Sequence, residues 1–171
     1  MEFHQKEIVT PLGPILATAD EEKLLRLDYG DAEEKGDLHK KHIRAFLDKH
    51  PVIDNGDTEL LKETEKQLQE YFQGERRSFD LPYEFHGTAF QKNVWKTLAS
   101  EVQFGETCSY KELAKNAGNE KAVRAIGGAM NKNPFSVIVP CHRVVGHTGK
   151  LTGYGGGVDK KVYLLELETT P

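Results

Sequence analysis

The sequence predicts a mixed α/β (α+β) fold with two domains. A small N-terminal domain would combine an antiparallel β-sheet with helices, and a mainly helical C-terminal domain would contain a helix-turn-helix. Short strand-like segments occupy about the first 30 residues, and helical apolar periodicity dominates the rest. Charge also differs between the halves: residues 1–86 carry 12 Lys and Arg against 20 Asp and Glu, a balance of −8, whereas residues 87–171 carry 11 against 7, a balance of +4. This asymmetry favours two modules, with any polyanion bound by the second.

The expected sheet comes from three short apolar segments, at residues 7–9, 15–17 and 24–27. The turn signal Thr10-Pro11-Leu12-Gly13 separates the first two, and the acidic turn Asp20-Glu21-Glu22 separates the last two. Closely spaced strands joined by short turns are typical of antiparallel pairing.

Two helices should complete the N-terminal domain, which we place at residues 1–80. The first is expected over about residues 39–49, stopped by Pro51. Asp57 or Thr58 can cap the second, which should end near Gly74. A linker is predicted at residues 81–86, and the C-terminal domain at residues 87–171.

The C-terminal domain should open with a helix capped by Thr88. Its apolar residues recur on one helical face, at Phe90, Val94, Trp95, Leu98 and Val102. Next, Ser109-Tyr110-Lys111-Glu112 has the spacing of a capping box, and the helix that it begins should end at Gly118.

A further helix is expected from about residue 120 to 131, which completes a helix-turn-helix. It contains Gly127-Gly128-Ala129, and each glycine costs about 1 kcal/mol of helix stability relative to alanine. Spacing alone leaves two explanations open: close approach of a nucleic-acid backbone, or tight packing on a neighbouring helix.

The remaining elements surround a cysteine. A short buried strand is predicted at residues 137–139, leading into Pro140-Cys141-His142-Arg143. A glycine-rich loop follows at residues 149–157, and Asp159 should cap a terminal helix through Leu167.

Composition excludes several classes of protein. Charged residues make up 29% and hydrophobic residues 37% of the chain, as in globular proteins. No apolar run approaches the roughly 18 residues of a membrane helix, and the first residues do not resemble a secretory signal. We therefore expect no membrane partner and a cytoplasmic location, or a nuclear one in a eukaryote. Two cysteines without a CxxC motif predict neither a disulfide scaffold nor a metal site.

Cys141 is the candidate nucleophile, because a thiolate needs a base or a positive charge nearby and His142 and Arg143 adjoin it. Adjacency alone leaves a packing role open, since neighbouring residues of an extended segment point to opposite sides. Cys108 is expected to be a small buried hydrophobe.

The segment Pro140-Cys141-His142-Arg143-Val144-Val145-Gly146 resembles the active-site motif of the O6-alkylguanine-DNA alkyltransferases, also called methylated-DNA–protein-cysteine methyltransferases. The resemblance covers residues 87–168 in order and is loose before them. The other similar segments are Phe104-Gly105-Glu106-Thr107, Ser109-Tyr110, residues 124–130, Asn133-Pro134, residues 153–157 and residues 164–168.

The resemblance implies a suicide enzyme that needs no cofactor. Cys141 would accept the alkyl group from guanine O6 irreversibly. His142 would take the thiol proton through a bound water, and Glu168 would orient His142. Asn133 would hold the active-site turn. Some relatives bind zinc through cysteines and histidines of the N-terminal half, but this half has no cysteine, so no metal is expected.

The resemblance also implies how DNA is bound. The partner would be double-stranded DNA containing O6-alkylguanine. The protein would be a monomer in solution. The helix-turn-helix would enter the minor groove and flip the damaged base out, with Arg124 filling its place and Tyr110 pushing on its phosphate. Gly127, Gly128 and Ala129 would allow the close approach, which favours the nucleic-acid explanation of the glycines. The expected substrate pocket consists of Tyr110, Met130, Val144, Tyr154 and Gly155.

Two alternatives belong to other classes. The chain could be a helix-turn-helix DNA-binding regulator or alkylation sensor, in which Cys141 is structural or senses alkylation. It could also be a thiol hydrolase, but that activity would leave the helix-turn-helix without a role.

Overall fold

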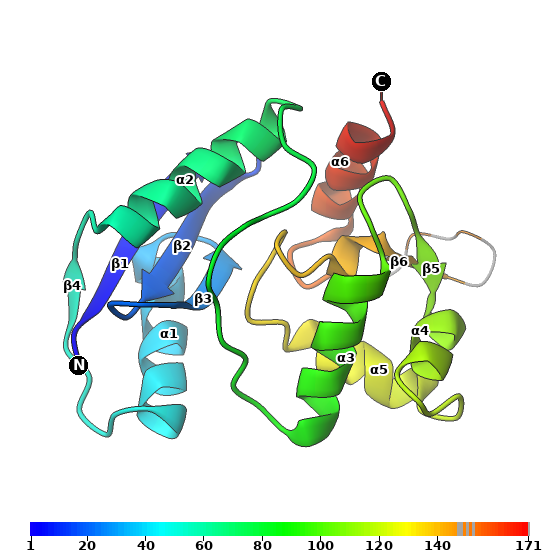
Figure 1. Ribbon diagram of the computed structural model, residues 1–171, viewed down its shortest axis with the longest axis horizontal. Coiled ribbons are helices and arrows are strands. Elements are labelled where there is room, and N and C mark those ends of the chain that lie inside the picture. The colour runs from blue at the N-terminus through cyan, green and yellow to red at the C-terminus, as the bar shows by residue number, and fades with distance from the viewer. Residues whose placement is uncertain (147–148, 150, 152, 171) are drawn as a thin grey trace. The chain divides into compact units, whose positions relative to one another are not determined.

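The computed structural model describes residues 1–146, 149, 151 and 153–170. The chain forms two compact units, Met1–His86 and Gly87–Pro171 (Figure 1). No helix within the described residues is long and apolar enough to span a bilayer.

A four-stranded sheet is the centre of the first unit. Its strands are β1 (Phe3–Thr10), β2 (Gly13–Ala19), β3 (Leu24–Tyr29) and β4 (Ile53–Asn55), in the order β3-β2-β1-β4. The three antiparallel strands expected from the sequence are confirmed, and each is longer than its apolar segment. Strand β4 was not expected; it pairs with β1 in parallel through only three residues.

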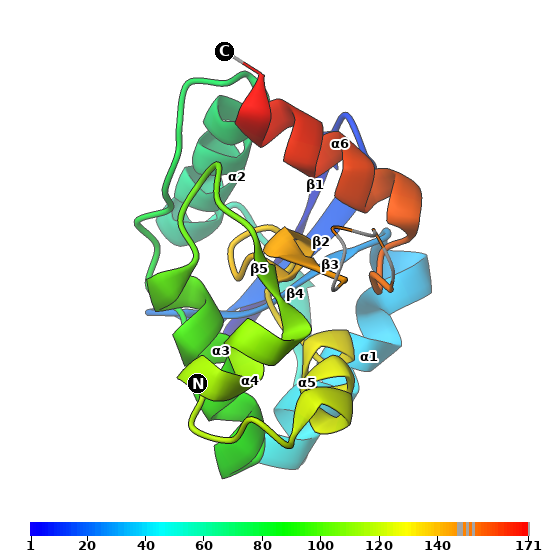
Figure 2. The same ribbon diagram turned by 90° about the vertical axis from the view of Figure 1, so that its right-hand side faces the viewer.

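Two helices cover opposite faces of this sheet, α1 (Ala32–Phe46) against β2 and β3 and α2 (Glu59–Phe72) against β1 and β2 (Figures 1 and 2). Residues 15–19 of β2 are all buried, although successive side chains point to opposite faces. The predicted cap of α2 at Thr58 is confirmed. The prediction for α1 was wrong: the helix begins at Ala32 rather than residue 39, because Asp31 accepts a hydrogen bond from Glu34 N and caps it there.

A buried polar network lies between α1 and the sheet. His39 donates from Nε2 to Asp28 Oδ2 (2.7 Å) and accepts at Nδ1 from the Thr18 hydroxyl (2.6 Å). Arg26 donates to both oxygens of Asp28. Burial acts to raise the pKa of Asp28, but the hydrogen bonds from His39 and Arg26 outweigh it and lower that pKa to about 2. Burial lowers the pKa of His39. The network therefore holds a carboxylate beside a neutral imidazole.

The residues expected to link the domains are hydrogen-bonded to the first unit. Leu24 N donates to Pro82 O, and Glu84 N donates to Leu24 O. These bonds extend the β3 edge of the sheet by a short parallel bridge between Leu24 and Tyr83.

Helices dominate the second unit, in which α3 (Ala89–Glu101), α4 (Tyr110–Asn116) and α5 (Val123–Asn131) pack against one another (Figures 1 and 2). The predicted caps at Thr88 and Ser109 are both complete capping boxes. Gly118 has the left-handed φ of +91° that the turn between α4 and α5 requires. The helix-turn-helix is therefore formed by α4 and α5.

Two helix starts differ from the prediction. Helix α5 begins at Val123 rather than near residue 120, because the preceding residues form turns. Helix α6 (Val158–Thr169) has Gly157 at its N-cap, with Asp159 inside the first turn. Asp159 therefore adds a negative charge beside the helix N-terminus but does not cap it.

The predicted strand at residues 137–139 was wrong. These residues form turns, and Val137 has a φ of +72°, which costs a β-branched residue about 1–3 kcal/mol. Their backbone bonds are local: Ile138 N donates to Ser136 O and Val139 N to Phe135 O. Among the described residues of this unit, the strand pair lies elsewhere, between β5 (Cys108–Ser109) and β6 (Val144–Val145), which run parallel.

Candidate active site

Cys141 begins a short 3-10 turn, Cys141–Arg143, immediately after the strained segment. The side chain is 6% exposed. Its Sγ accepts a hydrogen bond from Asn133 Nδ2 (3.1 Å) and donates to Met130 O (3.8 Å), the carbonyl of the last turn of α5. The thiol is thus held directly against the second helix of the helix-turn-helix.

Asn133 fixes the segment that leads to this thiol. Its amide also donates to Val139 O (3.0 Å), and its oxygen accepts from Phe135 N (2.9 Å). One side chain thereby fastens both ends of the turn that contains the strained Val137, a restraint that keeps such a conformation populated.

His142 and Glu168 form a buried pair. Since a carboxylate only accepts, His142 Nε2 carries the proton and donates it to Glu168 Oε2 (2.7 Å). Arg143 donates to both oxygens of Glu168, from Nε to Oε1 (2.8 Å) and from Nη2 to Oε2 (3.0 Å). Glu168 lies near the end of α6 but is buried, because its carboxylate is held by both of these side chains.

The other nitrogen of His142 is an acceptor in this tautomer. Nδ1 is buried and has no hydrogen-bond partner within the described part of the chain. Buried acceptors without a donor are rare, so the position of this nitrogen needs an explanation.

Burial sets the resting protonation of the thiol and the imidazole. It raises the pKa of Cys141 to about 12, although Asn133 and the charge of Lys161 act in the opposite direction. Burial also lowers the pKa of His142 against the opposing influence of Glu168. The resting site therefore contains a neutral thiol and a neutral imidazole whose Nδ1 can accept a proton.

Helix α3 holds both helices of the helix-turn-helix. Trp95 Nε1 donates to Ala129 O in α5 (2.8 Å), and Asn93 Nδ2 donates to Ala117 O at the end of α4 (2.7 Å). Ala129 itself is only 2% exposed. Ala129 was expected to lie close to DNA together with the two glycines, but its side chain is buried within the second unit.

The glycines of α5 face open space. A Cβ built on Gly127 or on Gly128 would have no atom within 4 Å among the described residues. This excludes tight helix packing as the reason for the glycine pair. Arg124 is exposed in the first turn of the same helix, and Gly128 is exposed as well. The outer face of α5 thus carries a cation and a backbone that an external surface can approach.

The residues expected to form the substrate pocket lie on several elements. Met130 is half-buried at the end of α5, and Val144 is buried in β6. Tyr110 begins α4, and its Oη would lie 3.6 Å from a Cβ built on Gly153. Tyr154 is half-buried and Gly155 exposed, but Lys150 and Thr152 of the same loop lie outside the described residues. Gly153 therefore lies beside the hydroxyl of Tyr110.

Two family models together match nearly the whole chain. The 6-O-methylguanine DNA methyltransferase ribonuclease-like domain matches residues 6–85, and the DNA binding domain of the same name matches residues 89–170. The methylated-DNA–protein-cysteine methyltransferase of Methanosarcina acetivorans is 44% identical, over 93% of this chain and 94% of that protein. The chain belongs to the methylated-DNA–protein-cysteine methyltransferase family.

Other family members have similar sequences and structures. The constitutive protein of Bacillus subtilis is 37% identical, over 93% of this chain and 91% of its own length. The crystal structure of the Mycobacterium tuberculosis O6-methylguanine methyltransferase matches with a TM-score of 0.79 and 37% identity, covering 98% of this chain and 93% of that one. The OGT of that organism in complex with DNA matches with a TM-score of 0.80 at 37% identity, covering 99% and 93%.

The burial of two cations, Arg143 and Lys161, was not predicted from the sequence. Arg143 was noted only as a charge beside Cys141, but it binds Glu168 and, through Nη1, Val102 O (2.8 Å). Lys161 was not singled out. A signal for it exists, because Lys161, Leu164 and Glu168 are spaced by three and four residues and share the buried face of α6.

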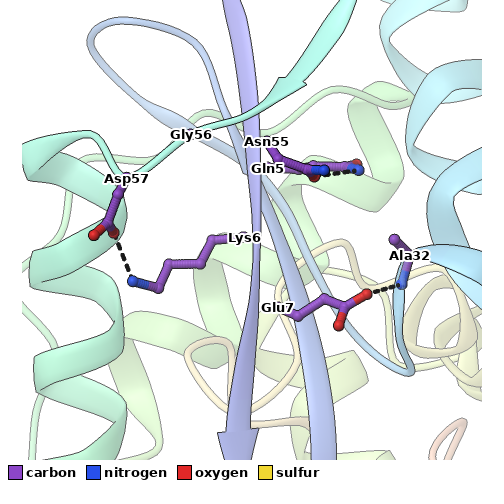
Figure 3. A pocket seen from close by; sticks show the side chains of 7 residues that line it. All are labelled: Gln5, Lys6, Glu7, Ala32, Asn55, Gly56 and Asp57. Atoms are coloured by element: carbon purple, nitrogen blue, oxygen red, sulfur yellow. Dashed lines mark hydrogen bonds and ion pairs between the residues drawn. The ribbon is translucent and has the colours of Figure 1, made fainter.

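A hollow in the first unit has a volume of about 500 Å³ and lies where β4 ends beside β1 (Figure 3). Its polar side chains bind one another: Lys6 pairs with Asp57, Gln5 donates to Asn55, and Glu7 accepts from Ala32 N. It is therefore a weaker candidate site than the Cys141 centre. Within the described residues, no three His, Cys, Asp or Glu side chains are arranged to hold a metal ion.

Proposed function

We propose that this protein repairs duplex DNA containing O6-alkylguanine, with O6-methylguanine as the first candidate lesion, by moving the alkyl group irreversibly to Cys141. The observation that carries the proposal is the position of the thiol. Cys141 Sγ contacts the last turn of the exposed glycine-containing helix α5, while the next residue, His142, is paired with buried Glu168. Membership of the methyltransferase family supports the same reaction.

The proposed chemistry begins from the neutral thiol. The proton of Cys141 passes through a bridging water to His142 Nδ1, and Glu168 stabilises the imidazolium. The S–C bond forms as the C–O6 bond breaks, the electron pair of the C–O6 bond stays on the guanine, and the guanine takes up the proton that the imidazolium then releases. The thioether product is stable, so each molecule reacts once.

The helix-turn-helix would deliver the base. We propose that α5 enters the minor groove, that Arg124 fills the space of the flipped guanine, and that Tyr110 pushes on its phosphate. Gly127 and Gly128 would admit the DNA backbone. The pocket for the flipped base would be formed by Tyr110, Met130, Val144, Tyr154 and Gly155.

The proposal places a monomer in the cytoplasm, or in the nucleus of a eukaryote. Cys108 and Cys141 are both free thiols, which suits a reducing compartment. Duplex DNA is the partner that the proposed reaction needs.

Label transfer tests the reaction directly. Duplex DNA with a radiolabelled O6-methyl group should leave one label per protein molecule, located on the Cys141 peptide by mass spectrometry. Cys141→Ala should abolish transfer, whereas Cys108→Ala is the matched control and should retain it. Transfer that persists in Cys141→Ala would exclude the proposal. Sequence-specific binding to undamaged duplex without transfer would favour a regulator.

The role of Arg124 can be separated from the chemistry. Arg124→Ala should slow repair of the duplex at least about tenfold, the loss expected for one good base or stacking contact, because only duplex requires flipping. Its reaction with free O6-benzylguanine should be unchanged. Lys132→Ala removes an exposed cation just beyond the same helix and serves as the control. Equal losses with both substrates would refute the flipping role.

A further inference from the structure

Val137 holds a strained backbone conformation four residues before the nucleophile. Among the described residues it is the single non-glycine position with a left-handed φ (+72°). A β-branched side chain is poorly suited to that region, yet Val137 is 2% exposed, so the surrounding structure encloses it. Strain of this kind persists only where the surroundings fix it, and it is concentrated at functional sites.

The strain belongs to a tight turn of a rare type. Ile138 N donates to Ser136 O (2.9 Å) around Val137, so the three residues form a γ-turn. With a positive φ at its centre the turn has the classic form, which is rare and strained, whereas the inverse form is common. The bond from Val139 N to Phe135 O (3.0 Å) encloses it in a wider turn. Two hydrogen bonds that bracket Val137 therefore hold its left-handed φ.

A second γ-turn of opposite hand follows. Cys141 N donates to Val139 O (2.8 Å) around Pro140, whose φ of −82° and ψ of 62° are those of the inverse form. Eight residues of extended chain would span about 26–29 Å. The turns instead fold the segment so tightly that the side chains of Asn133 and Cys141, at its two ends, meet (3.1 Å). The position of the thiol therefore depends on both turns keeping their shape.

The two turns are maintained in different ways. At Pro140 the proline ring itself fixes φ near the required value. At Val137 the local chemistry opposes the turn, because a β-branched residue loses free energy with a left-handed φ. Burying an isopropyl group gains free energy of the same order as this cost, so the enclosure of the Val137 side chain offsets the strain. The turn at Val137 therefore depends on its buried side chain.

We propose that Val137 is a positioning residue for alkyl transfer, whose buried side chain holds the strained γ-turn and thereby fixes Cys141 Sγ against Met130 O at the end of α5. This inference rests on the proposed function. Displacement requires the sulfur to meet the alkyl carbon in line with the C–O6 bond, and a misplacement of about 1 Å can cost about 100-fold in rate. Without the side chain the turn would relax, and the thiol would spend less time in line with that bond.

The test compares Val137→Ala, which removes most of the buried side chain but keeps the strain, with Val137→Thr, which keeps the branched shape. Val94→Ala is the matched control, because it makes the same deletion at a fully buried valine of α3. Single-turnover transfer from free O6-benzylguanine is measured over a range of substrate concentrations and requires no DNA. Labelling with iodoacetamide, resolved by mass spectrometry into the Cys141 and Cys108 peptides, reports how accessible each thiol is.

Val137→Ala should lower the maximal transfer rate about tenfold or more without changing the half-saturating concentration, because the pocket is intact. Iodoacetamide should label its Cys141 faster than in the parent protein, since the thiol leaves its enclosed position, while the labelling of Cys108 stays the same. Val137→Thr should transfer at close to the parent rate, and Val94→Ala should lose stability but not transfer. Loss of stability alone would instead speed the labelling of both cysteines.

Three results would overturn the proposal: a parent-like maximal rate in a folded Val137→Ala, a parallel rise in the labelling of both cysteines, or an equal loss of transfer in Val94→Ala. If circular dichroism shows that Val137→Ala is unfolded, Val137→Gly replaces it, because glycine removes the strain together with the side chain. A parent-like rate in the glycine variant would again contradict the proposal. If the parent protein transfers no benzyl group, the proposed function fails, while the labelling profiles still decide whether Val137 holds the thiol.

Discussion

Glu168 is the residue on which the charges of the site converge. It accepts from His142 and twice from Arg143, and all three side chains are buried. Hydrogen bonds to charged groups each contribute about 1.5–3 kcal/mol. Because Glu168 would stabilise the imidazolium only after proton transfer, its carboxylate should contribute more to the reaction than to the resting state.

We expect Glu168→Gln to slow alkyl transfer from free O6-benzylguanine by about 10- to 100-fold, the equivalent of one charge-assisted hydrogen bond. Affinity for undamaged duplex should change little, because the residue is buried away from the exposed face of α5. Single-turnover rates and filter-binding affinities check this. Glu166→Gln, at an exposed position of the same helix, is the control. A variant with normal transfer and reduced stability would limit Glu168 to a structural role.

Single residues were predictable where their chemistry is written in the chain. Cys141 was a candidate nucleophile because of its own chemistry, and the roles of His142 and Glu168 came from the resemblance. The structure places His142 and Glu168 in contact. The partner of Arg143 could not be predicted, since adjacency to Cys141 does not reveal that the guanidinium turns toward α6. The burial of Ala129 was missed because its small side chain suggested a close approach to DNA, and spacing alone did not reveal that the second unit encloses it.

At the scale of elements, the glycine pair lowers the stability of α5 but leaves the surface of this helix open to another molecule. A Cβ at Gly127 or Gly128 would meet no described atom, so the folded protein alone gives no reason for glycine. Each Gly→Ala replacement inside a helix stabilises it by about 0.5–1 kcal/mol, mainly by restricting the unfolded chain.

Gly127→Ala and Gly128→Ala should therefore each raise the free energy of unfolding by about 0.5–1 kcal/mol while weakening repair of the duplex. Reaction with free O6-benzylguanine should be unaffected. Urea denaturation and duplex repair rates measure the two effects. Ala125→Gly, at an exposed position of the same helix, should lower stability by a similar amount. If both alanine variants repaired duplex at the parent rate, α5 would not be the surface that approaches DNA.

Elements defined by local chemistry were predictable, and elements defined by distant partners were not. The caps at Thr58, Thr88 and Ser109 form as their side-chain spacing indicates. Residues 137–139 have strand-like composition, but Asn133 and local turns satisfy their backbone groups. Strands β4, β5 and β6 depend on pairing with segments far away in the sequence, which short apolar runs do not encode.

At the scale of the whole molecule, both units bury neutral histidines. Burial lowers the pKa of His39, of His42 (to about 3) and of His142. In the unfolded chain these groups titrate near 6.5. Below that pH these histidines bind protons in the unfolded state but not in the folded state. The stability that the protein has above pH 6.5 is therefore lost as the pH falls.

The free energy of unfolding should therefore drop between pH 7.5 and pH 5, by about 2 kcal/mol from His42 alone. Asp28, whose lowered pKa stabilises the fold only until the pH falls below about 4, contributes nothing in this window. Urea denaturation followed by circular dichroism at the two pH values gives the difference. His42→Gln should show a smaller drop than the parent, whereas the exposed control His50→Gln should show the same drop. Stability that is independent of pH in this range would contradict the neutral, buried histidines.

Because Trp95 is hydrogen-bonded to the backbone of α5, its fluorescence can report on changes in this helix. Trp95 is the single tryptophan of the chain, and it is buried in the second unit against the carbonyl next to Met130. Indole emission depends strongly on the polarity around the ring, so intrinsic fluorescence should report on the end of α5 and not on the sheet of the first unit. Denaturation curves from fluorescence and from circular dichroism should then separate if the two units melt independently. A change in emission after alkyl transfer would indicate that the modified sulfur displaces the end of α5.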